Sequence, residues 1–118
     1  MDNKNEVPQL DKELLAEYVQ SLGVDVVKCM FALYKQQEAI YINDIEKSLC
    51  CDDQNLWQEH CHKMKGASGS VGLKGLHLRL KLMEKTTANI AGKASQLVEL
   101  KIHSQETMAD FTKWIDSI

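Results

Sequence analysis

Apolar residues recur every three or four positions along most of this chain. This spacing places apolar side chains on one face of an α-helix. Gly23 ends the first apolar segment, whose members are Leu10, Leu14, Tyr18 and Leu22. The spacing predicts five helical segments, near residues 11–22, 26–49, 55–71, 76–90 and 94–114. No alternating apolar and polar stretch is long enough to predict a β-sheet.

The longest predicted segment, residues 26–49, is either one bent helix or two helices. Its predicted core stripe consists of Val26, Met30, Leu33, Ile40 or Tyr41, Ile45 and Leu49. The sequence CCDDQN then interrupts the pattern, with Asp52 or Asp53 as the expected N-cap of the next helix. Short breaks between amphipathic helices indicate an antiparallel helical bundle over residues 10–118. The polar residues 1–9 before it are expected to be a disordered lead or the remnant of a linker.

Length and composition limit the class of protein. The chain has 118 residues, which suits one compact domain, and a formal net charge of −3, which argues against a general nucleic-acid binder. No apolar run approaches the roughly 20 residues that span a bilayer, so no membrane contact is expected. The polar start is not a secretory signal, and the four cysteines form no C-x-x-C pair. Reduced thiols in the cytoplasm are therefore expected.

The segment EHCHKMKGASGSVGL places one histidine away from the core face of its helix. Successive helical residues turn by about 100°. The core-facing positions are then Trp57, Cys61, Met64, Ser68 and Val71. His62 lies well outside that set, on a face that it shares with Gln58, Lys65, Gly66 and Gly69. We therefore expect an exposed imidazole beside an ammonium group and two positions without side chains.

The glycines on this face lower the stability of the helix, which suggests that they serve a function. A glycine inside a helix costs roughly 1 kcal/mol relative to alanine. Gly66 is one turn beyond His62, where any larger side chain would stand beside the imidazole. Gly66 and Gly69 are therefore expected to leave a bare strip that another protein can approach closely. The alternative interpretation is that glycine accumulated at tolerated surface positions.

The other histidines are interpreted as structural or surface groups. His60 lies about 200° around the helix from His62, near the edge of the core face, and is expected to be half buried. His77 and His103 are single residues on other predicted helices. A zinc site built on the HCH sequence is disfavoured, because His60 and His62 point to opposite sides of the helix.

An exposed imidazole beside a lysine can carry a phosphoryl group. Neutral histidine is a nucleophile near pH 7 and can hold the group as phosphohistidine. Lys65, three residues after His62, would balance the added negative charge. The sequence contains no Walker-type phosphate loop and no magnesium-binding carboxylate cluster. The metal ion and most of the transition-state stabilisation would therefore come from a partner.

The residues HKMKGASGSVG, from His62 to Gly72, resemble the signature of histidine-containing phosphotransfer (HPt) domains. That signature reads His-x-Leu-Lys-Gly, then two positions of serine or alanine, and closes with a glycine. Met64 replaces the usual leucine at a core position, and Gly72 matches the closing glycine. HPt domains occur, among other places, at the C-terminus of hybrid sensor histidine kinases.

The resemblance implies a fold and a set of roles. It implies an all-α, antiparallel four-helix bundle core with an additional N-terminal helix, present as a monomer. By motif position, His62 is the phosphorylated residue, Lys65 compensates its charge, and Gly66 lets a receiver domain dock. Gln58 and Gly69 share that face and are candidate contacts.

The resemblance also implies partners and a cellular setting. HPt domains relay phosphoryl groups between aspartates of response-regulator receiver domains in multistep two-component signalling. No cofactor or metal is expected on this chain, and Mg²⁺ would be held by the receiver. The location would be cytoplasmic, within a parent protein anchored in the inner membrane or as a free-standing protein. The alternative function is a non-catalytic helical adaptor that binds a partner through an apolar groove.

Overall fold

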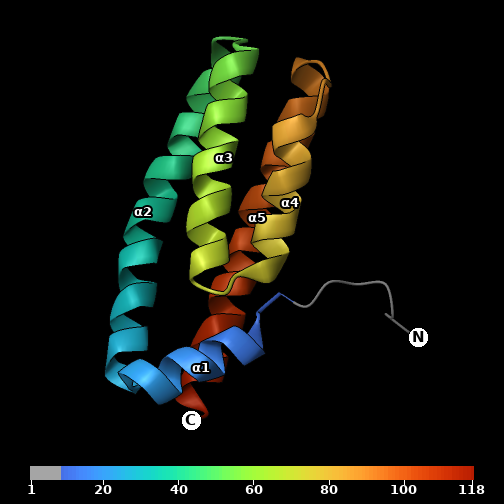
Figure 1. The fold of residues 1–118 in the computed structure, drawn as a ribbon. Coiled ribbons are helices and arrows are strands. Elements are labelled where there is room, and N and C mark those ends of the chain that lie inside the picture. The colour runs from blue at the N-terminus through green and yellow to red at the C-terminus, as the bar shows by residue number, and fades with distance from the viewer. Residues whose placement is uncertain (1–8) are drawn as a thin grey trace, which may run out of the picture.

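The computed structural model describes residues 9–118, which form five helices (Figure 1). The helices are α1 (Lys12–Leu22), α2 (Val24–Cys50), α3 (Gln54–Ser70), α4 (Lys74–Lys85) and α5 (Ile90–Asp116). The described residues contain no strand, in agreement with the all-α prediction. The predicted lead lies outside the described residues except for Gln9, whose backbone carbonyl accepts a hydrogen bond from the Gly75 N–H at 3.1 Å.

Helices α2 to α5 lie side by side as an antiparallel four-helix bundle, and α1 crosses its lower end (Figure 1). Helix α1 is tied to the connection between α3 and α4. The Asp11 N–H donates to the Gly72 carbonyl at 2.8 Å, and the Tyr18 hydroxyl donates to the Ser70 carbonyl at 3.0 Å. The additional N-terminal helix therefore fixes the end of the bundle where α3 turns into α4.

Two of the predicted helix ends are confirmed. Gly23 separates α1 from α2 with φ +90°, in the region that favours glycine. The Asp53 side chain accepts a hydrogen bond from the Leu56 N–H at 3.0 Å, and Asp53 is thus the N-cap of α3. α2 is one continuous helix over all 27 of its residues rather than two helices.

The predicted helix end near Ile90 is wrong. α4 ends at Lys85, and Thr86 adopts an extended conformation with ψ 142°. The Asn89 side chain then accepts a hydrogen bond from the Gly92 N–H at 2.9 Å. An asparagine in this position is a favoured N-cap, so Ile90 begins α5 instead of ending α4.

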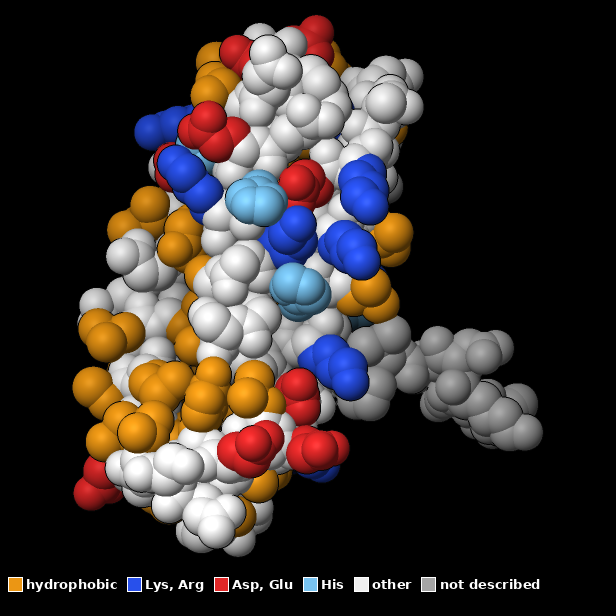
Figure 2. Space-filling view, in the orientation of Figure 1, with side chains coloured by type: hydrophobic (Ala, Val, Ile, Leu, Met, Phe, Trp, Pro, Cys, Tyr) orange, Lys and Arg blue, Asp and Glu red, His pale blue; other side chains and the backbone are white. Residues whose placement is uncertain are grey.

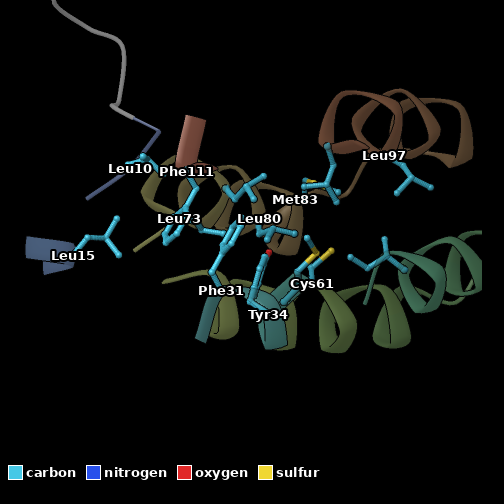
Figure 3. Packing of buried hydrophobic residues seen from close by; sticks show 14 of the residues in the cluster. Leu10, Leu15, Phe31, Tyr34, Cys61, Leu73, Leu80, Met83, Leu97 and Phe111 are labelled. Carbon is cyan, nitrogen blue, oxygen red and sulfur yellow. The ribbon is translucent and has the colours of Figure 1, made fainter. Parts of the chain in front are cut away.

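One face of each bundle helix packs into a shared core (Figure 3). Phe31 of α2 stacks on Phe111 of α5, with ring centroids 3.9 Å apart. Figure 3 shows Phe31 and Tyr34 directed toward residues of α4 and α5, including Leu80. Every helix in residues 9–118 is too short or too polar to traverse a bilayer.

The predicted core stripe of α2 is only partly correct. Ile45 is buried and Leu49 is half buried, but Val26, Leu33 and Ile40 are 44%, 57% and 54% exposed. The buried residues of α2 are Val27, Phe31, Tyr34, Ile45 and Ser48. Apolar residues of α2 occupy two stripes that are offset by about one residue, and packing against the neighbouring helices buries the stripe that contains Phe31.

Candidate functional site

His62 lies on the outer face of α3, and its side chain is 66% exposed. On the opposite side of the helix, Trp57, Cys61 and Met64 are each 0% exposed. The helical periodicity therefore places the imidazole in solvent while it buries the neighbouring residue Cys61. The expected exposure of His62 is confirmed.

A carboxylate from α4 contacts both His62 and Lys65. The Glu84 oxygens lie 3.2 and 3.3 Å from the His62 Nδ1 atom, and one of them lies 2.7 Å from the Lys65 Nζ atom. The hydrogen bond from Lys65 is the main cause that lowers the pKa of Glu84, and His62 adds to it. An ionised carboxylate can only accept hydrogen bonds, so the proton of a neutral His62 ring resides on Nδ1. The Nε2 lone pair is then free.

Glu84 is the one residue of this cluster that the motif does not contain. Its position follows from the hairpin formed by α3 and α4, whose connection, residues 71–73, is centred on Gly72. His62 lies ten residues before Gly72 and Glu84 lies twelve residues after it. In an antiparallel pair of helices, residues at nearly equal distances from the turn lie at about the same level. The hairpin register is therefore a sequence signal that could have identified Glu84.

Lys65 and Gly66 lie one turn beyond His62. The Lys65 side chain is only 20% exposed, because its ammonium group is held against Glu84. A Cβ atom added to Gly66 would meet nothing within 4 Å. The predicted open space at Gly66 is confirmed, whereas Lys65 is paired rather than free.

The predicted bare strip does not extend to Gly69. The His77 ring of α4 covers that residue, and a Cβ atom on Gly69 would lie 2.7 Å from the His77 Nδ1 atom. The same nitrogen lies 3.0 Å from the Lys65 backbone carbonyl. Gly69 is therefore required for helix packing, and His77 is a packed residue of the site rather than an isolated surface group.

The residues of α3 beneath His62 are buried, and the Cys61 thiol among them is unreactive. Burial, together with the nearby Glu84 charge, raises the pKa of the Cys61 thiol to about 12. The Trp57 indole donates a hydrogen bond to the Met83 carbonyl at 2.7 Å, and the Lys93 ammonium lies 5.4 Å from the indole centroid. These contacts fix α3 against α4 and α5 beneath the exposed imidazole.

The face where α3 and α4 meet combines two kinds of surface (Figure 2). Figure 2 shows histidine side chains on this face, with lysine and arginine side chains between and beside them. Apolar side chains gather toward its lower left, over α1 and the lower part of α2. We call the groove-lining part of this region the apolar patch, defined as Tyr18, Met30, Leu33, Tyr41 and Val71.

The remaining histidines lie apart from this cluster. His60 is half buried, as predicted. The His103 side chain is 40% exposed and lies 3.5 Å from Glu106 on its own helix. Within residues 9–118, no three histidine, cysteine or acidic side chains converge in a way that could hold a metal ion.

The sequence model of the Hpt domain family matches residues 30–110, which include His62, Lys65 and Glu84. The chain belongs to the Hpt domain family. It is accordingly a histidine phosphotransfer module of phosphorelay signalling, and HPt domains interact with receiver domains.

Two further comparisons agree with this assignment. The aerobic respiration control sensor protein ArcB is 32% identical over 75 residues in Escherichia coli O157:H7 and 31% identical over 75 residues in Escherichia coli K12. The match covers 64% of this chain but only 10% of those relatives, so the chain spans about a tenth of their length. The solved histidine-containing phosphotransfer domain of ArcB from Escherichia coli has the same fold, with a TM-score of 0.82 at 23% identity over 92% of this chain and 94% of that one.

Proposed function

We propose that His62 carries the phosphoryl group, with Nε2 as the attacking atom. The observation that carries this proposal is the 66% exposed ring whose Nδ1 atom faces the Glu84 carboxylate. A carboxylate behind a histidine ring fixes its tautomer and orientation and increases its basicity. Among the described histidines, only His62 has both a carboxylate from another helix at its ring and open space beside it at Gly66.

The transfer step balances without a proton leaving the ring. The Nε2 lone pair attacks the phosphorus of a receiver phosphoaspartate, a P–N bond forms, and the P–O bond breaks with its electron pair going to the aspartate oxygen. The proton on Nδ1 stays in place, so the phosphorylated ring is an imidazolium. Glu84 stabilises that positive charge through the Nδ1 contact of 3.2 Å.

Lys65 supplies the compensating charge for the phosphoryl oxygens. In the unphosphorylated protein its Nζ atom is 2.7 Å from Glu84 and therefore already lies beside the ring. A phosphoryl group on Nε2 competes with Glu84 for this flexible ammonium group. We expect Lys65 to move to the phosphoryl oxygens, while Glu84 keeps its contact with Nδ1.

The partner proposed for this face is a receiver domain that brings its own Mg²⁺. Gly66 leaves space beside the ring for the rim of the receiver active site. The apolar patch, with Leu33 57% exposed, offers area for a stable but reversible contact. Gln58 is exposed one turn before His62 and is a candidate contact, as is the edge formed by Gly69 and His77. We further propose a cytoplasmic setting and a monomeric state.

The test is phosphoryl uptake from phosphorylated receiver domains. His62→Gln is expected to fold normally and to accept no acid-labile, base-stable phosphate. His103→Gln, a matched surface substitution on α5, should transfer as the parent chain does. Uptake by His62→Gln at the rate of the parent chain would show that another residue is the acceptor.

A helical adaptor remains the second candidate, because the apolar patch is exposed independently of the histidine. An adaptor would bind its partner equally well after His62→Gln and would transfer no phosphoryl group at all. Binding measurements on the same two variants therefore separate the two functions.

A further inference from the structure

The backbone carbonyl of Lys65 accepts hydrogen bonds from two side chains. It accepts a hydrogen bond from the His77 Nδ1–H at 3.0 Å and another from the Ser68 hydroxyl at 3.1 Å. The His77 contact joins α4 to α3, and it does so one turn beyond His62. A carbonyl accepts and cannot donate, so His77 holds its proton on Nδ1.

Glycine at position 69 makes this contact possible. The His77 ring occupies the space of the missing side chain, and a Cβ atom there would lie 2.7 Å from Nδ1 and 3.3 Å from the next ring carbon. Real Cβ atoms do not approach ring atoms this closely, so any larger residue at position 69 displaces the ring. Gly66, one turn away on the same helix, has no such neighbour within 4 Å.

His77 and Glu84 lie on the same face of α4, about two turns apart. Both contact Lys65, because His77 binds its carbonyl and Glu84 binds its ammonium group. Glu84 also reaches the His62 Nδ1 atom at 3.2 Å. The spacing of the two helices over these two turns therefore affects whether Glu84 touches His62.

We propose that His77 is a positioning residue that holds α4 against α3 so that Glu84 stays within reach of His62 and Lys65. Its effect on transfer rests on the proposed function, whereas its effect on the His62 ring is a property of the unphosphorylated protein. A donor at the δ position of residue 77 is what the contact needs. Asparagine provides such a donor, and alanine does not.

The first experiment compares His77→Ala and His77→Asn by NMR of the imidazole nitrogens in the unphosphorylated chain. In the parent chain the His62 signals should report a ring protonated at Nδ1 and hydrogen bonded to a carboxylate. His77→Ala is expected to shift those signals toward a mixture of tautomers and to slow transfer about tenfold. His77→Asn should restore both properties most of the way to the parent values.

The second experiment uses the two glycines as a matched pair. Gly69→Ala displaces the His77 ring and should reproduce the His62 signals and the transfer rate of His77→Ala, whereas Gly66→Ala should leave the His62 ring signals unchanged. The double substitution Gly69→Ala, His77→Ala should be no worse than His77→Ala alone, because the clash is gone. This non-additivity is the signature of two residues that act through one contact.

Parent-like His62 ring signals and transfer rates in His77→Ala would overturn the proposal. So would a Gly69→Ala variant that loses transfer while its His62 signals stay unchanged. Circular dichroism verifies that each variant is folded, and His77→Asn still tests the donor if alanine at this position prevents folding. Absence of transfer in the parent chain itself would count against the proposed function, and the ring signals would still decide the role of His77.

Discussion

At the residue scale, the central feature is one carboxylate shared by two donors. Glu84 contacts the His62 ring and the Lys65 ammonium group, and the three groups come from two helices. The pairing keeps a reactive ring oriented although it is 66% exposed. It also keeps a long lysine side chain ordered at a surface where it would otherwise sample many rotamers.

Glu84→Gln is expected to lower the unfolding free energy at neutral pH by about 0.5 kcal/mol. Because the pKa of Glu84 is held below its ordinary value by Lys65, the contribution is complete above the unfolded pKa of about 4.3. It disappears as the pH falls through the folded pKa. Urea unfolding at pH 7 and pH 3 should therefore show a larger difference between parent and variant at pH 7 than at pH 3.

Glu99→Gln is the control for this titration. Its carboxylate lies 3.8 Å from Arg79 and is 59% exposed, so its removal should change stability less than the removal of Glu84. A parent-to-variant difference for Glu84→Gln that is the same at both pH values would contradict the charge-based explanation.

The four cysteines should differ in reactivity. Cys29, Cys50 and Cys51 are exposed, whereas Cys61 is buried with its pKa raised to about 12. Since the thiolate is the reactive form, a colorimetric thiol reagent should label three cysteines in the folded chain and all four in denaturant. Rapid labelling of Cys61 in the folded chain would mean that α3 opens beneath His62.

At the element scale, α3 was the helix that its sequence specified best. Its apolar residues recur every three or four positions and therefore share one narrow face. Trp57, Cys61 and Met64 could thus be predicted to be buried and His62 to be exposed. The prediction for α2 was less successful because apolar residues occur on two adjacent faces. Tertiary packing against the neighbouring helices, which includes the stack of Phe31 on Phe111, determines which face is buried, and those contacts are not visible in local spacing.

The site was predictable to the extent that it lies on one helix. His62, Lys65 and Gly66 follow from the periodicity of α3 and from the family motif. Glu84 and His77 come from α4, and their contacts depend on the register between two helices. A single-helix analysis therefore explained Gly69 as open surface, when its neighbour on α4 fills that space.

The turn between α3 and α4 should be sensitive to a methyl group. Gly72 has φ +77°, and a Cβ atom there would lie 2.8 Å from the Leu15 side chain of α1. Gly72→Ala is therefore expected to lower the unfolding free energy by about 1–3 kcal/mol. Gly66→Ala should instead raise it by up to about 1 kcal/mol, because it improves helix propensity in open space. Chemical denaturation of both variants measures these changes, and equal effects would refute the backbone argument.

At the scale of the whole molecule, some of the apolar residues that α2 leaves outside the core line the apolar patch. Leu33 is 57% exposed and belongs to the apolar patch, in a groove that Ala67 and Ser70 of α3 also line. Val98 of α5 is also 57% exposed but is not part of the patch. Because Leu33 and Val98 are equally exposed, substitution of Val98 is a control for substitution of Leu33 in the patch.

Leu33→Asp is expected to raise the receiver concentration needed for half-maximal transfer about tenfold. It should change the unfolding free energy by no more than about 0.5 kcal/mol, because the side chain is exposed. Val98→Asp should leave transfer unchanged. Transfer rates measured against receiver concentration provide the comparison, and a similar loss in both variants would exclude the patch as a specific docking surface.

The α3–α4 hairpin has a consequence for how such domains diversify. His62, Lys65, His77 and Glu84 all lie between Gln54 and Lys85, in one uninterrupted stretch of chain. Of the apolar patch, only Val71 lies within that stretch, and its other members belong to α1 and α2. If the proposed function holds, substitutions in α1 and α2 would change receiver recognition without altering His62, Lys65, His77 or Glu84.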